Sequence, residues 1–114
     1  LAYRVGDLVF TSGQLGINEE GNMASPQDYD KQVHQVFKNL DHVLQAAGSG
    51  IDKIIRTTVY QTDISNLPRF VELRAKYLKA PFPASTQVAI TALGHPQAMI
   101  EIDAIALVGG QIID

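Results

Sequence analysis

The sequence predicts an α+β fold in which one β-sheet carries two helices on a single face. Three observations lead to this prediction. Segments of strand and helix character follow one another in the order strand, strand, helix, strand, helix, strand, strand. Both helical segments are amphipathic, so each needs an apolar surface to pack against. The last strand segment has apolar residues at alternate positions, which is the pattern of a strand with one buried face.

The composition fits one folded domain spanning residues 1–114, since this length suits a single hydrophobic core. Hydrophobic residues make up 46% of the chain and charged residues 18%, which excludes a disordered chain and mildly favours an oligomer. A net charge of −3 argues against a broad surface for nucleic acid or anionic membranes. The chain has no cysteine, so disulfides, a thiol nucleophile and thiolate metal sites are excluded.

No apolar run approaches the roughly 20 residues that a membrane-spanning helix needs. The sequence also has no cationic leader followed by an apolar signal core. We therefore expect a soluble, cytoplasmic protein with no membrane partner. The chain starts at Leu1 and not at methionine, so we expect the natural N-terminus to lie upstream.

The first two strands are predicted at residues 3–5 and 8–12. The second of these is a β-branched and aromatic run, Leu-Val-Phe-Thr-Ser, with a glycine on each side. Gly6 and Asp7 between the two segments are typical of a tight hairpin turn. The polar residues 18–22 then predict a loop.

The first helix is predicted to begin with Ser25 as its N-cap. Pro26 suits the first helical turn, and Asp28 completes a variant of the capping box. Gly48 is expected to end the helix in a left-handed conformation. The apolar positions of its buried face recur at three-and-four spacing. They are Val33, Val36, Phe37, Leu40, Val43, Leu44 and Ala47.

A long strand at residues 53–62 follows, because this segment is rich in β-branched residues. Residues 63–66 predict a turn and cap, and a second helix is expected over residues 67–79. Pro81 and Pro83 then predict an extended exit from that helix.

The last two strands are predicted at residues 86–91 and 99–107, joined by the turn sequence Gly94-His95-Pro96. One face of the final strand carries Ile100, Ile102, Ala104 and Ala106. Its other face carries apolar residues among the acids, namely Met99, Ile105 and Leu107. A sheet face left to water would be more polar. The second face of the sheet is therefore expected to be covered by self-association.

Three segments resemble the reactive intermediate deaminase family (RidA, also called YjgF-like or L-PSP). They are Thr11-Ser12-Gly13-Gln14, the run Thr-Thr-Val-Tyr-Gln-Thr-Asp from residue 57, and Ile-Glu-Ile-Asp-Ala-Ile-Ala from residue 100. The resemblance extends over residues 3–106. It implies a chorismate-mutase-like subunit in a homotrimer, with small-molecule clefts between subunits and hydrolysis of enamines or imines. It implies no cofactor.

The resemblance also implies site residues. Glu101 falls on the cleft glutamate of the family, while Ser12 and Gly13 match residues that help to bind the ligand. On spacing alone, Glu101 and Asp103 point to the same face, roughly 6 to 7 Å apart. A partly buried carboxylate there would have a raised pKa and move protons or position a water. The alternative is that both are solvated or paired with arginines.

The chain departs most from the family signature Pro-Ala-Arg-Ser at the arginine, which holds the substrate carboxylate in the relatives. Here Ser85 takes that place, and Val71 takes the place of an asparagine in the second helix. A serine hydroxyl is neutral and offers one hydrogen bond where a guanidinium offers two and a charge. Arg74, beside the apolar stripe of the second helix, is either a cation that reaches the cleft or a side chain lying along the surface.

No metal site is predicted, because His34, His42 and His95 lack ligand spacing and are expected on the surface. Two functions remain open for the sequence. One is an enamine or imine deaminase with a changed substrate range, and the other is a non-catalytic small-molecule-binding or regulatory protein. Ribonuclease activity, ascribed to some relatives, is not supported here, because the net charge is acidic and the chain has no pair of histidines suited to general acid–base catalysis.

Overall fold

The sheet opens with the predicted hairpin, in a computed structural model that describes residues 1–109. Strands β1 (Ala2–Val5) and β2 (Leu8–Thr11) pair antiparallel, so the predicted pairing is confirmed. The turn between them places Gly6 at φ 60°, a left-handed conformation that glycine adopts without steric cost.

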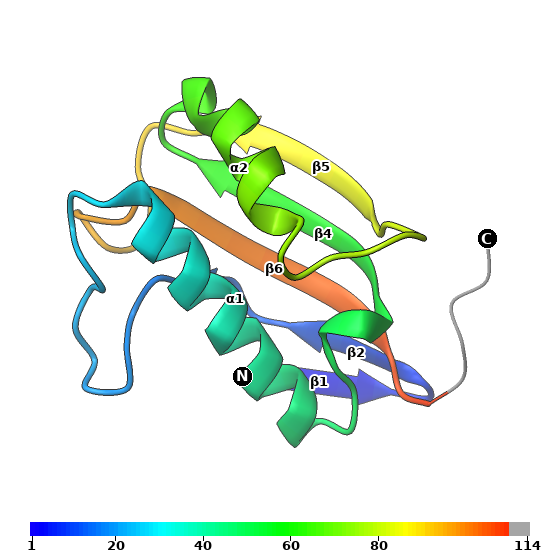
Figure 1. Cartoon of the computed structure of the whole chain (residues 1–114). Helices are drawn as coiled ribbons and strands as arrows, with labels where there is room; N and C mark the ends of the chain where they lie inside the picture. Colours follow the sequence, from blue (N-terminus) through cyan, green and yellow to red (C-terminus); the bar gives the residue numbers. More distant parts are fainter. Residues whose placement is uncertain (110–114) are drawn as a thin grey trace.

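The remaining strands complete one mixed sheet (Figure 1). Its order is β1-β2-β6-β4-β5, with β4 at Ile54–Gln61, β5 at Ala84–Ala89 and β6 at Ile100–Leu107. β4 and β5 run parallel, and every other pairing is antiparallel. A two-residue strand, β3 (Gln14–Leu15), which the sequence pattern did not predict, also pairs with β6.

Helix α1 (Tyr29–Ala46) begins later than predicted. Its N-cap is Asp28, whose side chain accepts a hydrogen bond from the Lys31 backbone at 3.1 Å. Ser25 is not the cap, because it has a positive φ of 52° and its carbonyl accepts the Asp28 N–H in a separate turn. Gly48 follows the helix with φ 84°, which confirms the predicted end.

Helix α2 (Leu67–Arg74) is shorter than the predicted span to residue 79. After Arg74 the chain continues in hydrogen-bonded turns, in which Tyr77 and Leu78 both donate to the Arg74 carbonyl. Two short 3₁₀ turns, η1 (Ile51–Lys53) and η2 (Ile64–Asn66), lead into β4 and α2 respectively.

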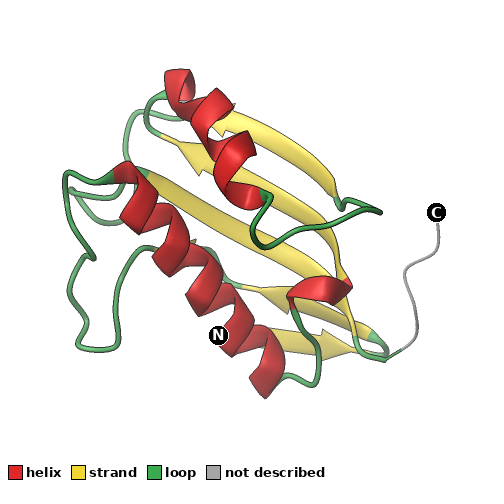
Figure 2. Cartoon of the chain, viewed as in Figure 1, coloured by secondary structure: helices red, strands yellow, loops and turns green. Residues whose placement is uncertain are grey.

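Both helices lie on the same face of the sheet (Figure 2), as the sequence predicted. The core is formed between this face and the apolar stripes of the helices. Phe37 of α1 links the two helices, because its ring stacks on Phe70 at 6.2 Å and on Tyr77 at 4.5 Å between centroids. The predicted inner residues of β6 are each at most 3% exposed: Ile100, Ile102, Ala104 and Ala106.

The opposite face of the sheet, which we call the open face, is covered by neither helix (Figure 1). Because Val9 and Ala106 pair on the helix side, the next pair along, Phe10 and Ile105, points to the open face. Tyr3 pairs with Phe10 and lies in the same row. Tyr3 is 72% exposed and Phe10 40% exposed, so the open face presents large apolar side chains to solvent in the single chain.

The described residues contain no helix whose length and apolar character would let it cross a bilayer.

Candidate functional site

A bulge in the sheet shapes the first part of the site. Phe10 of β2 pairs with Ile105, and Gln14 of β3 pairs with Ile102. The chain therefore advances four residues from β2 to β3 while the paired strand β6 advances three. One residue more than the ladder needs therefore lies between β2 and β3. Thr11 compensates for the interrupted ladder, because its hydroxyl accepts a hydrogen bond from the Ala104 N–H at 3.0 Å.

The bulge carries Ser12 and Gly13. The Ser12 N–H donates to the Leu1 carbonyl at 2.8 Å, which ties this segment to the start of the chain. The Ser12 residue is exposed, and its hydroxyl makes no hydrogen bond within residues 1–109. This hydroxyl is thus available to a ligand oxygen or nitrogen.

Glu101 lies directly against Gly13. A Cβ added at Gly13 would overlap the carboxylate oxygen Oε1 of Glu101 and would be 2.6 Å from its Cδ. Glycine is required here because the carboxyl group approaches the backbone closely, and not because of an unusual φ. The structure therefore brings together three of the predicted site residues, Ser12, Gly13 and Glu101.

The carboxyl group of Glu101 sits in an environment that favours its protonated form. Burial raises the pKa of Glu101 above its ordinary value of 4.5, and the like charge of Asp103 raises the pKa further. Both residues are half-buried and share the open face, as their spacing predicts. A carboxyl group of this kind can accept a proton from water and return it to a nearby nitrogen.

Tyr60 is a neighbour of this pair that the sequence argument did not identify. It lies opposite Glu101 in the β4–β6 ladder, and its hydroxyl donates to Oδ2 of Asp103 at 3.4 Å. The charge of Asp103 is the main cause of a raised Tyr60 pKa. From the sequence, the alternation of side chains along the strand shows only that Tyr60 lies on one of the two faces of the sheet. The register of β4 against β6, which the sequence does not show, places Tyr60 beside the two acids.

Ser85 and Arg74 lie on the other side of the sheet. The Thr57 hydroxyl, which is nearly buried, donates to the Ser85 hydroxyl at 3.0 Å. Thr57 pairs with Ala104, an inner residue, so this contact is on the helix side. Ser85 and Arg74 line the same small cavity of about 10 Å³, between α2 and the sheet, which has room for about one water.

The five predicted site residues thus form two groups, one on each face of the sheet. Glu101 of the open face lies against Gly13, the residue that follows Ser12, whereas Ser85 and Arg74 line one cavity under α2. The open face has a cation of its own, Arg56, whose guanidinium donates to the Thr86 hydroxyl. Arg56 is four residues from the Glu101 partner Tyr60 along β4, which is a distance of about 13 Å.

No cluster of three or more histidine, cysteine, aspartate or glutamate side chains suited to a metal ion is present within residues 1–109.

Comparison with known proteins gives a family match over nearly the whole chain. Residues 2–108 match the family described as Endoribonuclease L-PSP. The chain is 34% identical over 105 residues to a protein of Arabidopsis thaliana named Reactive Intermediate Deaminase A, chloroplastic, covering 92% of this chain and 56% of that protein. It is 33% identical to a RutC family protein of Saccharolobus solfataricus, covering 90% of this chain and 81% of that protein.

Solved structures agree with this match. The structure of RidA from the Antarctic bacterium Psychrobacter sp. PAMC 21119 superposes with a TM-score of 0.88 at 30% identity, covering 94% of this chain and 85% of that one. The Rid family protein YyfA from Yersinia pestis has the same TM-score and coverage at 38% identity. The predicted fold class is therefore confirmed by both sequence and structure.

Proposed function

The chain belongs to the Endoribonuclease L-PSP family, which has relatives named reactive intermediate deaminase, and from this membership we propose that it hydrolyses small enamines or imines. The observation that carries the proposal is the Glu101 carboxyl group, which lies against Gly13, the residue next to the exposed Ser12. The reaction takes place in a cleft between subunits of a homotrimer, and it uses no cofactor.

The apolar open face supports the oligomer. Tyr3, Val5 and Phe10 are 72%, 64% and 40% exposed in the single chain, and they lie in register on neighbouring strands. Contiguous exposed apolar residues of this kind mark a protein–protein interface. Because Glu101 and Asp103 are on the same face, assembly through this surface encloses both acids near a subunit boundary and further raises the pKa of Glu101.

The proposed chemistry is an addition of water followed by loss of ammonia. As the water oxygen bonds to the imine carbon, the carbon–nitrogen double bond becomes a single bond, and Glu101 passes a proton from the water to the nitrogen, which gives a carbinolamine. Glu101 then accepts the proton of the carbinolamine hydroxyl and passes it to the nitrogen as the carbon–nitrogen bond breaks. The products are a carbonyl compound and ammonia, or a carbonyl compound that keeps the amine when the imine is cyclic. Ser12 donates a hydrogen bond to the reacting group, and Glu101 returns to its starting state. A raised pKa suits Glu101 to both proton transfers.

The substrate range follows from residue 85. A bidentate arginine–carboxylate contact comprises two charged hydrogen bonds of about 1.5 to 3 kcal/mol each, and its loss would weaken binding of an imino acid by at least on the order of a hundredfold. Ser85 is neutral, and both Ser85 and Arg74 face away from Glu101 within one chain. We therefore assign neutral imines, and not 2-imino acids, as the preferred substrates.

A second candidate is a non-catalytic binding or regulatory protein that uses the same cleft. The observation that favours it is the same neutral residue at position 85, which leaves no fixed cation at that position to orient an anionic substrate for attack.

Turnover measurements distinguish the two candidates. The protein is incubated with freshly generated 2-aminoacrylate and with neutral cyclic imines, and release of ammonia or of the carbonyl product is followed. The deaminase proposal predicts turnover of neutral imines that Glu101→Gln abolishes and that Glu20→Gln, a matched change in an exposed loop, leaves intact. Rates equal to buffer with every substrate would support the binding protein instead.

A companion variant tests the assignment of substrate. Because residue 85 lies on the opposite face from Glu101 within one chain, it can serve the Glu101 cleft only from a neighbouring subunit of the proposed homotrimer. In that arrangement Ser85→Arg is expected to add hydrolysis of 2-aminoacrylate, because it restores a guanidinium at the position that holds the carboxylate in the relatives. No gain in a variant that remains folded and hydrolyses neutral imines would contradict the role assigned to residue 85.

A further inference from the structure

The lysines of the chain gather on one surface, away from the open face. Two neighbouring hollows of about 650 and 560 Å³ lie on the helix side, and Asp41, Ile51 and Tyr77 line both of them. We call the two together the lysine groove. Every lysine of the sequence lines it, and these are Lys31, Lys38, Lys53, Lys76 and Lys79.

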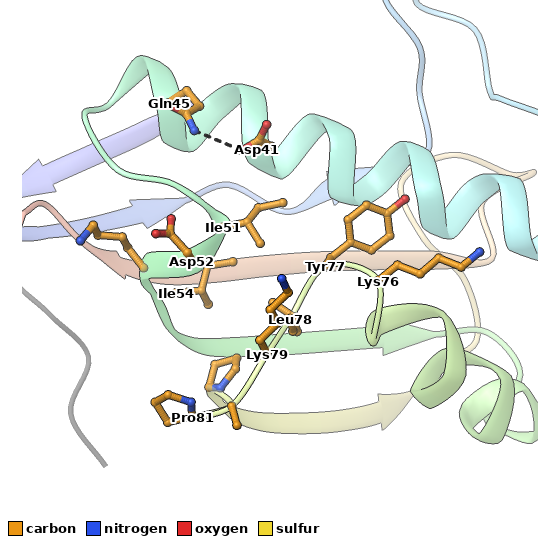
Figure 3. A pocket seen from close by; sticks show the side chains of 13 residues that line it. Asp41, Gln45, Ile51, Asp52, Ile54, Lys76, Tyr77, Leu78, Lys79 and Pro81 are labelled. Carbon is orange, nitrogen blue, oxygen red and sulfur yellow. Dashed lines mark hydrogen bonds between the residues drawn. The ribbon is translucent and has the colours of Figure 1, made fainter.

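The first hollow lies between the end of α1, the η1 turn and the segment that follows α2 (Figure 3). Asp41 and Gln45 come from α1, and the Gln45 amide donates to Asp41 at 3.4 Å. Lys76 and Lys79 come from the opposite wall, with the apolar side chains of Ile51 and Tyr77 between the walls (Figure 3). The second hollow continues along α1 past Lys38 and Lys31.

The charge of the groove is opposite to that of the chain. Five lysines and the two aspartates Asp41 and Asp52 give its lining a net charge of +3, whereas the whole chain has a net charge of −3. Lys31, Lys38, Lys76 and Lys79 form no salt bridge with any acid in the part of the chain that the structure describes. A groove lined by one sign of charge concentrates ligands of the other sign.

The floor of the groove is held by ring packing and a hydrogen bond and is partly apolar. The Tyr77 ring stacks on Phe37, and the Tyr77 hydroxyl is hydrogen-bonded to Nδ1 of His34 at 2.5 Å. His34 is therefore half-buried as a partner of Tyr77, and it also lines the second hollow. Ile51, Leu78 and Pro81 add further apolar lining.

From this combination we propose that the lysine groove binds an acidic peptide segment with interspersed apolar side chains, supplied by a partner protein. The carboxylates pair with the lysines, and the apolar side chains pack on Ile51, Tyr77 and Leu78. The site is distinct from the Glu101 cleft and remains outside an oligomer assembled through the open face.

Nucleic acid fits the same groove less well. No arginine lines either hollow, and Asp41 and Asp52 would repel phosphates. One face of the Tyr77 ring is already occupied by Phe37, which limits base stacking. A bare phosphate chain would also leave the apolar floor uncovered.

The test is fluorescence anisotropy with a short fluorescein-labelled peptide of Glu-Glu-Leu repeats, using the full chain in its own oligomeric state. We expect saturable binding that weakens as salt rises to about 0.5 M, where charges are strongly screened. The double variant Lys76→Gln, Lys79→Gln is expected to bind about tenfold more weakly, since each exposed ion pair contributes modestly. Lys76→Arg, Lys79→Arg keeps both charges and is expected to retain binding.

Three results would overturn the proposal. The first is no saturation below about 1 mM peptide, and the second is an equal affinity for the matching Gln-Gln-Leu peptide. The third is tighter binding of oligouridylate with the same dependence on the lysines, which would assign the groove to nucleic acid. Arg4→Gln, which removes one positive charge on β1 outside the groove, must leave peptide binding unchanged. Thermal unfolding of each variant shows that it remains folded.

Discussion

Replacing Gly13 with alanine is expected to displace the Glu101 carboxyl group while leaving the stability of the fold nearly unchanged. The new Cβ would lie 2.6 Å from Cδ and 2.9 Å from Cγ of Glu101, and it would overlap Oε1. All three atoms belong to the end of a flexible side chain, so Glu101 can rotate away from the bulge. We therefore expect Gly13→Ala to change the free energy of unfolding by less than about 1 kcal/mol, because no backbone atom has to shift.

The same rotation displaces the carboxyl group by more than an ångström. A misplacement of this size costs on the order of a hundredfold in rate, so turnover of neutral imines should fall about that much. The displaced carboxyl group also becomes more hydrated, so the pKa of Glu101 should fall toward its ordinary value of 4.5. The assays are steady-state hydrolysis, thermal unfolding and a carboxyl-carbon NMR titration of Glu101.

Gly94→Ala is the matched control, because no atom lies within 4 Å of a Cβ at Gly94 and its φ is not positive. An unchanged pKa of Glu101 and an unchanged rate in Gly13→Ala would refute the reasoning.

Further predictions concern the core, the acids and the open face. Gln32 is fully buried. Its amide nitrogen lies within hydrogen-bond distance of three backbone carbonyls, and its amide oxygen accepts from one backbone N–H. Gln32→Leu should therefore lower the free energy of unfolding by about 2 to 4 kcal/mol in denaturant titrations, and a loss below about 1 kcal/mol would contradict this. Asp103→Asn should lower the Glu101 pKa without restoring it fully, because burial is the larger cause; a full return of the pKa to 4.5 in an NMR titration would refute that order. Because the pKa of Glu101 is raised in the folded state, its contribution to the free energy of unfolding is present below pH 4.5 and is lost as the pH rises through the folded-state pKa. In Glu101→Gln the free energy of unfolding should therefore fall less across this pH window, as unfolding curves at several pH values would show. Tyr3→Ser combined with Phe10→Ser should shift sedimentation toward the single chain, and an unchanged oligomer would remove the open face from the interface.

Periodicity was sufficient for most of the fold. Alternation along β6 identified Ile100 and Ile102 as inner residues, and both are fully buried. The helix boundaries were harder to predict, because Ser25 and Asp28 are both good N-caps and the positive φ at Ser25, which the sequence does not show, decides between them. Two-residue strands such as β3 carry too few positions to show a period.

The site was predictable in part. Motif resemblance pointed to Ser12, Gly13 and Glu101, and these residues do lie together. The sequence could not show the bulge that joins them, since a bulge depends on the register of two strands far apart in the chain. The same holds for Ser85, whose placement on the helix side follows from its pairing with Thr57.

The central claim is that catalysis occurs on the open face at Glu101, and the location of a bound product tests it most directly. A crystal of the oligomer soaked with the carbonyl compound released from its best neutral imine should show that compound's oxygen within hydrogen-bond distance of Ser12 or Glu101. Electron density for the compound beside Arg74 and Ser85, with the Glu101 carboxyl group solvated, would contradict the account.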